Sequence, residues 1–441
     1  MLIDVHCHLF TKKVLTQGLT RLENYLTQLE KVSIPASKIA PEDFLKFSDT
    51  AFDFANKAVQ LTPLEMYEDM RSGYGEDLII VPLMVDFSYT FLAPKDKVLE
   101  NKKSLLSTMK KASKKSREKV MNDWLNELAV SVEKKLDTYD RSVVLLDFFK
   151  NSYEEQIKDL SLLKSQLGDK VFPFFSIDPR RNEEFEQGIL GEIKKYVGKD
   201  KIFAGLKLYT SLGYSPTHPV LYDDSESESV YAYCEKHEIP ITVHASLEGF
   251  SHMLDKNYVE GDIYYAPAGQ AVPADDVFED GVVSYKNNLY GMAFSDLTRE
   301  RLLTLNHPTL WEKVLEKYPN LKLNLAHFGG ILQMTKLVNG NKTGFYAGHI
   351  INMMKKYKNV YTDMACLYNF SGEEGYMDKI YECVYAPLPE ELKDRVMFGS
   401  DYYMLCLFNT TLDDYITAFK SAFGSEFIRI SEVNSLRFLF G

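Results

Sequence analysis

The chain has 441 residues, of which 45% are hydrophobic and 26% are charged, a composition typical of a folded globular protein. The length allows two or three domains, but a single α/β barrel with insertions reaches the same size. The formal net charge of −12 argues against binding to nucleic acid, because that affinity comes chiefly from Lys and Arg neutralising phosphates.

The chain opens on a predicted strand that carries two histidines. Residues 2–5 are mostly apolar and favour a strand, which places His6 and His8 on one face and Cys7 on the other, where it packs. Two imidazoles on one face can share a metal ion. A lone His-x-His is more often structural, so the motif gains weight only if later strands also end in ligands.

Seven further apolar runs predict strands. They occupy residues 77–87, 171–177, 203–209, 239–245, 321–327, 360–365 and 396–401. Helical patterns such as residues 225–237 and 308–318 lie between them, and this alternation is typical of repeated βα units. Eight such strands predict one (β/α)₈ TIM barrel over residues 1–441. The run 143–149 fits a strand or a buried helix, and we assign it to a helix.

Three stretches are longer than a plain barrel needs. Residues 10–75 and 95–140 are predicted to be mainly helical insertions, and residues 249–295 form a loop on the face where barrel active sites lie. The lysine-rich run 95–119 is interpreted as a solvated helix face, with a site for an anionic partner as the less favoured alternative.

Targeting and redox features predict a cytoplasmic protein. The first strand starts almost at Met1, which leaves no room for an export signal, and no window approaches the roughly 20 apolar residues of a membrane span. Five scattered cysteines without Cys-x-x-Cys spacing favour reduced thiols. A homo-oligomer is compatible with this kind of barrel, but no pattern specifies an interface.

Polar residues close several of the predicted strands. His244, His327 and Asp401 end the fifth, sixth and eighth strands, and a barrel brings these ends together with His6 and His8. Three imidazoles and a carboxylate suit Zn²⁺, with Mn²⁺ or Fe²⁺ as alternatives. The fourth imidazole can act as a general acid or base. Any one of these residues alone could be structural, but their coincidence favours a metal site.

Lys207 in the fourth strand also needs an explanation. It lies between Leu206 and Leu208, and a buried lysine is costly unless it has a partner, is modified or has a lowered pKa. The alternative, equally supported for this residue alone, is that its amine reaches solvent along an extended side chain.

These motifs make the chain resemble the amidohydrolase superfamily, specifically the amidohydrolase-related (amidohydrolase 2) branch of metal-dependent barrel enzymes that also contains decarboxylases and lactonases. The resemblance runs from His6 to Asp401 and is carried by His-x-His, GLKLYTSLGYSP, VHAS, LAHFGG and FGSDYY. It implies one divalent ion held by His6, His8, His244 and Asp401.

The resemblance leaves two residues with open roles. It implies that His327 is a catalytic residue or a ligand of a second ion. Some superfamily members carry a carboxylated lysine that bridges two metals, and Lys207 lies on the matching strand. One ion is the commoner expectation in this branch, so Lys207 would instead contact a substrate carboxylate or stay unmodified.

The implied activity is hydrolysis of a small amide, ester or lactone by metal-activated water, with Asp401 as proton shuttle and His327 as electrophile or acid. Non-oxidative decarboxylation of a small carboxylic acid, for example an aromatic one, is the alternative. An anionic substrate is favoured under either chemistry if Lys207 and Arg180 reach the pocket. A non-catalytic barrel is the third hypothesis. Weaker substrate-contact candidates are Arg180, Tyr209, Tyr402 and Tyr403, for which packing or a surface position is the favoured alternative. Of the remaining histidines, only His252 lies near the site loop.

Overall fold

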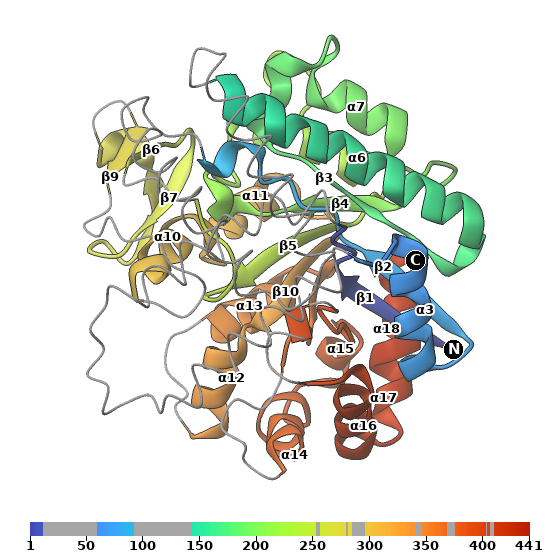
Figure 1. Ribbon diagram of the computed structural model, residues 1–441. Coiled ribbons are helices and arrows are strands. Elements are labelled where there is room, and N and C mark those ends of the chain that lie inside the picture. Colours follow the sequence, from blue (N-terminus) through green and yellow to red (C-terminus); the bar gives the residue numbers. More distant parts are fainter. Residues whose placement is uncertain are drawn as a thin grey trace, which may run out of the picture.

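Eight parallel strands form a barrel at the centre of the computed structural model (Figure 1). The structure describes residues 1–11, 60–91, 143–252, 256–278, 281–284, 296–340, 346–367, 375–402, 404–405 and 410–441. The barrel strands are β1 (Leu2–Cys7), β2 (Leu78–Pro82), β3 (Phe174–Ser176), β4 (Gly205–Leu208), β5 (Ile241–Ser246), β10 (Leu323–Gly329), β11 (Val360–Asp363) and β12 (Val396–Met397).

Isolated bridges close the barrel at the two junctions between its two-stranded and six-stranded sheets. Strands β3, β4, β5, β10, β11 and β12 pair in that order, and β1 pairs with β2. Parallel bridges from Ile80 to Val171 and from Leu83 to Phe174 join β2 to β3, and a bridge from Cys7 to Tyr402 joins β1 to the segment after β12. All eight predicted strands are present, so the predicted (β/α)₈ barrel is confirmed.

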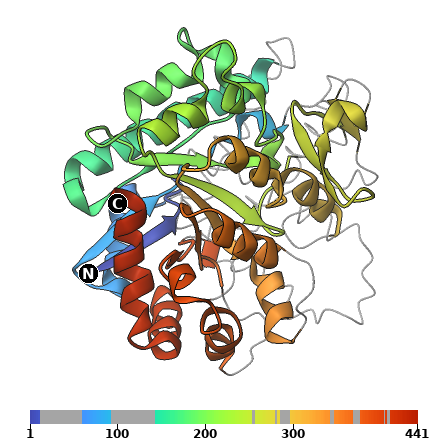
Figure 2. The same cartoon turned by 180° about the vertical axis from the view of Figure 1, so that it is seen from behind.

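Helices surround the barrel in both views (Figures 1 and 2). The α-helices are α3 (Pro63–Tyr74), α6 (Val143–Leu167), α7 (Gly188–Tyr196), α8 (Pro219–Tyr222), α9 (Val230–Lys236), α10 (Asp296–Asn306), α11 (Leu310–Lys317), α12 (Ile331–Val338), α13 (Tyr346–Lys356), α14 (Tyr376–Ile380), α15 (Glu390–Lys393), α16 (Leu412–Phe423), α17 (Glu426–Ile428) and α18 (Asn434–Phe440). Shorter turns of 3₁₀ helix are η1 (Ser88–Phe91), η2 (Gly168–Lys170), η3 (Pro179–Glu184), η4 (Thr210–Leu212) and η5 (Ala274–Asp276), and η7 (Tyr381–Tyr385) and η9 (Arg429–Val433) are π-helical.

The predicted helices occur where the sequence indicated. The ambiguous run 143–149 begins α6, and the patterns at 225–237 and 308–318 correspond to α9 and α11. Helix α3 begins with a capping box in which Thr62 and Glu65 satisfy each other's backbone N–H groups. Among the described residues, no helix is both long enough and apolar enough to cross a membrane.

The predicted insertions are only partly described. Most of the first insertion and all of the second lie outside the described residues, apart from α3. The loop after β5 forms two small antiparallel pairs, β6 (Lys256–Tyr258) with β9 (Val282–Ser284) and β7 (Asp262–Tyr265) with β8 (Gln270–Pro273). They lie beside α10 at one side of the barrel (Figure 1) and enclose a small apolar cluster around Val259 and Ile263.

Two apolar layers separate the inside of the barrel from its outside. Ile3, Val5, Phe174 and Met397 belong to an inner cluster, against which Phe438 of α18 also packs. Cys7 belongs to the larger layer between the strands and the surrounding helices, so its predicted packing role is confirmed. The chemistry-bearing residues lie beyond the inner cluster, at the carboxyl ends of the strands.

Candidate metal centre

A bulge in β1 determines where its two histidines point. Asp4 pairs with Ile80 but Cys7 pairs with Pro82, so β1 has one extra residue in this interval. The Asp4 carboxylate accepts the His6 N–H at 3.1 Å, which takes that group out of the ladder with β2. Val5 already faces the inner cluster, and strict alternation would aim the next side chain outward. A bulge re-aims side chains in this way, and His6 reaches Asp363 across the barrel.

His6, His8 and Asp401 converge on one point. Asp401 Oδ1 lies 3.6 Å from His6 Nε2 and 3.3 Å from His8 Nε2, and all three side chains are buried. His6 Nε2 and Asp401 Oδ1 are buried polar atoms without a hydrogen-bond partner in the described part of the chain. Gly399 leaves the space for this arrangement, because a Cβ added there would lie 2.7 Å from His6 Cβ.

His244 and His327 form a second pair beside this group. His244 Nδ1 lies 3.1 Å from His327 Nε2, and the His327 ring centroid is 4.5 Å from that of His6. Their other ring nitrogens face backbone carbonyls, with His244 Nε2 2.6 Å from Glu248 O and His327 Nδ1 3.2 Å from Ala365 O. A carbonyl only accepts, so both of those nitrogens carry the proton of a neutral imidazole.

The same reasoning assigns the tautomers of His6 and His8. His6 Nδ1 faces the Asp363 carboxylate at 3.1 Å, and His8 Nδ1 faces Leu83 O at 2.8 Å. Each Nδ1 therefore donates, which leaves a lone pair on each Nε2. The Nε2 atoms of His6 and His8 thus face Asp401, and His244 Nδ1 faces His327 Nε2. A divalent cation would satisfy these acceptors.

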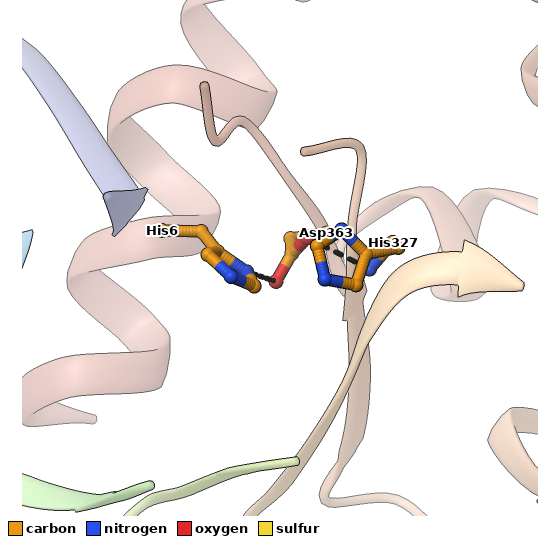
Figure 3. A group of neighbouring side chains, drawn as sticks. All are labelled: His6, His327 and Asp363. Carbon is orange, nitrogen blue, oxygen red and sulfur yellow. Dashed lines mark hydrogen bonds and ion pairs between the residues drawn. The ribbon is translucent and has the colours of Figure 1, made fainter. Parts of the chain in front are cut away.

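Asp363, which the sequence analysis missed, joins three parts of this site. It ends β11 and accepts hydrogen bonds from His6 and from the backbone N–H of His327 (Figure 3). His6, His327 and Asp363 form one group whose ligand atoms lie within 4.8 Å of one another, and His6, His8 and Asp401 form another. The run VYTDMA was predicted as a strand, and Asp363 is a polar residue near its end. That position was the signal by which the sequence could have revealed it.

Left-handed backbone conformations gather at the same place. Of the five described non-glycine residues with positive φ, four lie at these strand ends: His327 at 66°, Phe328 at 47°, Cys366 at 61° and Asp401 at 57°. Such conformations cost energy and persist where surrounding contacts impose them, commonly at functional sites. The Asp401 N–H, for example, donates to His6 O at 2.7 Å.

Burial and charge set the protonation of the site. Burial lowers the pKa of His6 to about 3 against the opposing field of Asp363, and burial also lowers the pKa of His244 and His327. Burial alone would raise the pKa of Asp363 and Asp401, but the neighbouring imidazoles hold both well below their usual range. Neutral imidazoles and ionised carboxylates are the forms that bind metal ions.

Lys207 is the cation of the site. Its side chain is fully buried, and its Nζ has no hydrogen-bond partner among the described residues. Burial lowers the pKa of Lys207 to about 8, while the charges of Asp363 and Asp401 act in the opposite direction. The structure therefore rules out the reading in which this side chain extends to solvent.

The weaker candidates have structural partners. The Arg180 guanidinium donates two hydrogen bonds to Asp178, from Nε at 2.8 Å and Nη2 at 2.6 Å. The Tyr402 hydroxyl donates to Asp69, and Tyr403 lies outside the described residues. Tyr209 stacks on His244 with ring centroids 4.2 Å apart, and the backbone carbonyl of Tyr402 accepts the N–H of His8 at 3.2 Å, so both contact a predicted ligand.

His252, His218 and His307 are not part of this group of side chains. His252 is buried in the loop after β5, and its N–H donates to Ser211 O. His218 caps α8 and His307 stacks on Tyr264. The structure thus brings together His6, His8, His244, His327, Asp401 and Lys207 of the predicted site, and adds Asp363.

One family model, described as amidohydrolase, matches residues 145–422. No curated protein sequence matches the chain significantly.

Several solved structures are similar over the whole chain. A 2,6-dihydroxybenzoate decarboxylase has 13% identity, covers 99% of this chain and 98% of its own, and has a TM-score of 0.46. A 5-carboxyvanillate decarboxylase from Novosphingobium aromaticivorans with bound manganese has 13% identity, coverage of 100% and 97%, and a TM-score of 0.46. A probable 2-pyrone-4,6-dicarboxylic acid hydrolase from Acinetobacter baumannii has 11% identity, coverage of 99% and 98%, and a TM-score of 0.45. Similarities this distant say nothing about the reaction of this chain.

Proposed function

Because the chain belongs to the amidohydrolase family, we propose that it is a metal-dependent hydrolase of a small amide, ester or lactone. One observation carries the metal dependence. His6, His8, His244 and His327 each direct an N–H at a protein acceptor, so the free Nε2 atoms of His6 and His8 face Asp401, and the free nitrogens of His244 and His327 face each other. Within the described part of the chain, His6 Nε2 and Asp401 Oδ1 have no hydrogen-bond partner, and a divalent cation would satisfy both.

The proposed ligands of one ion are His6, His8, His244 and Asp401, with His327 and Lys207 as further candidates. Three imidazoles and a carboxylate suit Zn²⁺, so Zn²⁺ is the first choice and Mn²⁺ or Fe²⁺ are the alternatives. When bound, such an ion makes a hydroxide available near neutral pH and polarises a carbonyl. The bulge in β1 fits this role, because it directs the paired histidines of β1 to the same point.

Asp401 and His327 are the proposed catalytic groups. Asp401 is held ionised, so its carboxylate can accept the proton of the attacking water. His327 Nε2 carries the lone pair that faces His244, and in this proposal the His327 imidazole polarises the substrate carbonyl or transfers a proton to the leaving group. Their left-handed backbones fix both side chains at the mouth of the barrel.

The charge of the site favours an anionic substrate. Asp363 and Asp401 together would balance a divalent ion. The buried Lys207 ammonium would then have the Tyr209 ring at 5.6 Å, but no hydrogen-bond partner and no further balancing anion among the described groups that act on its pKa. Burying a charge without a hydrogen-bond partner is costly, and a substrate carboxylate would reduce that cost on binding. The proposed substrate is therefore a small molecule with a carboxylate beside the reacting bond.

Decarboxylation of a small carboxylic acid is the second candidate, and Lys207 is the observation that favours it. A buried ammonium beside a metal site can hold a carboxylate in the reacting position as well as in a neighbouring one. The two reactions differ in their products, because hydrolysis consumes water and decarboxylation releases CO₂.

The deciding experiment combines metal analysis with a substrate panel. The purified protein is reconstituted with Zn²⁺ or Mn²⁺, and about one ion per chain is expected; less than about one-third of an equivalent would contradict a site of this ligand type. The loaded protein is then assayed against amides, esters, lactones and aromatic carboxylates, with CO₂ measured separately. A carboxylate product without CO₂ supports hydrolysis, and CO₂ release supports the alternative.

Asp401→Asn separates an enzyme from a non-catalytic barrel, the third hypothesis. The amide cannot accept the proton of water, so any activity found should fall by at least about a hundredfold, the usual contribution of a general base. Activity that survives this substitution unchanged would reject the assigned role of Asp401. Location in the cytoplasm stays a prediction from the sequence.

A further inference from the structure

We propose that Asp363 is the positioning residue of this site, which selects the tautomer of His6 and holds the backbone of His327. The carboxylate is fully buried at the end of β11 and reaches β1 on one side and β10 on the other. This inference rests on the proposed metal site, because it assigns the Nε2 lone pair of His6 to the ion.

One oxygen of Asp363 acts on the His6 ring. Asp363 Oδ2 lies 3.1 Å from His6 Nδ1 and accepts the Asn324 Nδ2 amide at 2.7 Å. An ionised carboxylate only accepts, so the His6 proton is held on Nδ1 and the lone pair on Nε2. Carboxylates commonly orient metal-binding histidines in this way.

The other oxygen acts on the backbone. Asp363 Oδ1 accepts the N–H of His327 at 2.9 Å and the N–H of Ala365 at 3.1 Å. His327 has a φ of 66°, which is unfavourable for a residue with a Cβ. The two hydrogen bonds compensate for this conformation and aim the His327 ring at His244.

These contacts also argue against Asp363 as a metal ligand. The carboxylate accepts four hydrogen bonds, two on each oxygen, which uses the roughly four lone-pair positions it has. An ion bound between His6, His327 and Asp363 would have to displace some of these donors. Asp363 therefore supports the ligands of the first group and does not hold a second ion.

Substitution by asparagine tests the two roles separately. In Asp363→Asn the amide oxygen can stay at the Oδ1 position and keep both backbone hydrogen bonds. The amide NH₂ then faces His6 Nδ1 and can only donate, so His6 must move its proton to Nε2, which faces Asp401. Asn324 can reverse its amide to receive the second proton, because its Oδ1 has no partner among the described residues.

The experiment reads the tautomer directly in metal-free protein. Uniformly ¹⁵N-labelled protein is examined by two-bond ¹H–¹⁵N correlation of the imidazoles, with the His6 signals assigned from the spectrum of His6→Gln. The wild-type protein should show His6 protonated on Nδ1, and Asp363→Asn should show it protonated on Nε2. Zn²⁺ affinity should fall about 10- to 100-fold in the variant.

The control is Asp262→Asn, which converts another buried carboxylate that pairs with Lys313. It should leave the His6 tautomer and the Zn²⁺ affinity unchanged. A wild-type His6 protonated on Nε2 overturns the proposal even if no variant folds, and so does an Asp363→Asn protein that keeps Nδ1–H. Wild-type protein that binds no metal but shows the expected tautomers contradicts the proposed function and leaves the positioning role supported.

Discussion

The Nδ1 of His244 and the Nε2 of His327 face each other at 3.1 Å, although each ring has already given its N–H to a backbone carbonyl. Two imidazole lone pairs at this distance repel unless a cation lies near them. Burial lowers the pKa of both rings, so protonation of one ring does not remove the repulsion at neutral pH. In the proposed metal site a bound ion would relieve this repulsion, so the metal-free pair should lower the stability of the protein.

His244→Gln should show that this histidine pair lowers the stability of the metal-free protein. The glutamine amide can donate to His327 Nε2 and remove the repulsion, so the metal-free variant should unfold at the same or a higher temperature than metal-free wild type. Added Zn²⁺ should raise the melting temperature of the wild type and should raise that of the variant far less. Calorimetry with and without Zn²⁺ measures both effects.

The control for this comparison is His307→Gln. His307 is a buried histidine that stacks on Tyr264, and its loss should leave the metal-induced rise in melting temperature intact. An equal loss of that rise in both variants would mean that His244 has no special relation to the ion.

Gly399→Ala should disturb the site through packing alone. The new Cβ would lie 2.7 Å from His6 Cβ and 3.1 Å from Ala365 Cβ, so β1 or the end of β12 must shift. Overpacking of this kind costs about 1 to 3 kcal/mol, and the displaced His6 should weaken Zn²⁺ binding at least tenfold. Urea unfolding and a competition assay for Zn²⁺ measure the two effects.

A matched glycine lies in α13. Gly348 is exposed and a Cβ there meets nothing within 4 Å, so Gly348→Ala should be neutral or stabilising by up to about 1 kcal/mol. Zn²⁺ binding that stays normal in Gly399→Ala would show that the site tolerates a Cβ beside His6.

Lys207→Met should separate substrate binding from stability. Removing a fully buried ammonium that has no hydrogen-bond partner among the described residues should leave the free energy of unfolding unchanged or raise it. Activity on anionic substrates should fall at least a hundredfold, mainly through KM, while any neutral ester should be affected much less. Kinetics on a matched pair of charged and neutral substrates tests this.

Lys322→Met serves as its control. Lys322 is also a buried lysine, but its amine donates to the carbonyl oxygen of Gly441. Its loss should cost stability and leave the preference for charged over neutral substrates as it was. The anionic-substrate proposal would not survive a Lys207→Met enzyme with unchanged KM for both substrates.

Asp86 and Arg181 should make the protein sensitive to acid. The Arg181 guanidinium donates to both oxygens of Asp86, and both side chains are buried in the segments after β2 and β3. Burial would raise the pKa of Asp86, but Arg181 and Ser88 more than offset it and hold that pKa below its usual value. The stabilisation is therefore present above the ordinary aspartate pKa of about 3.9 and is lost as the pH falls through the folded value.

Asp86→Asn measures this contribution. At neutral pH it should cost about 3 to 5 kcal/mol, because Arg181 keeps its buried charge and loses its main partner. The difference from wild type should stay constant down to about pH 5 and shrink below about pH 4, where Asp86 takes up a proton in the unfolded wild-type chain but is still ionised in the folded one. Urea unfolding across this range provides the measurement, and a difference independent of pH would refute the assignment.

The sequence by itself determined the eight strands and most of the site, because both depend on local pattern. Apolar runs mark the strands, and His244, His327 and Asp401 stand at strand ends that a barrel must bring together. Lys207 was predicted for the same reason, since a lysine between two leucines of a strand is unusual in the sequence itself.

Only the tertiary structure decided how these residues face one another. The bulge that aims His6 inward depends on Asp4 and on the register between β1 and β2, which no periodicity records. Asp363 escaped notice because its importance lies in donors that come from β1, β10 and its own strand end, more than 30 positions away in the sequence for His6, Asn324 and His327. Hydrogen bonds between distant segments form only when the barrel closes, so their geometry is a property of the fold.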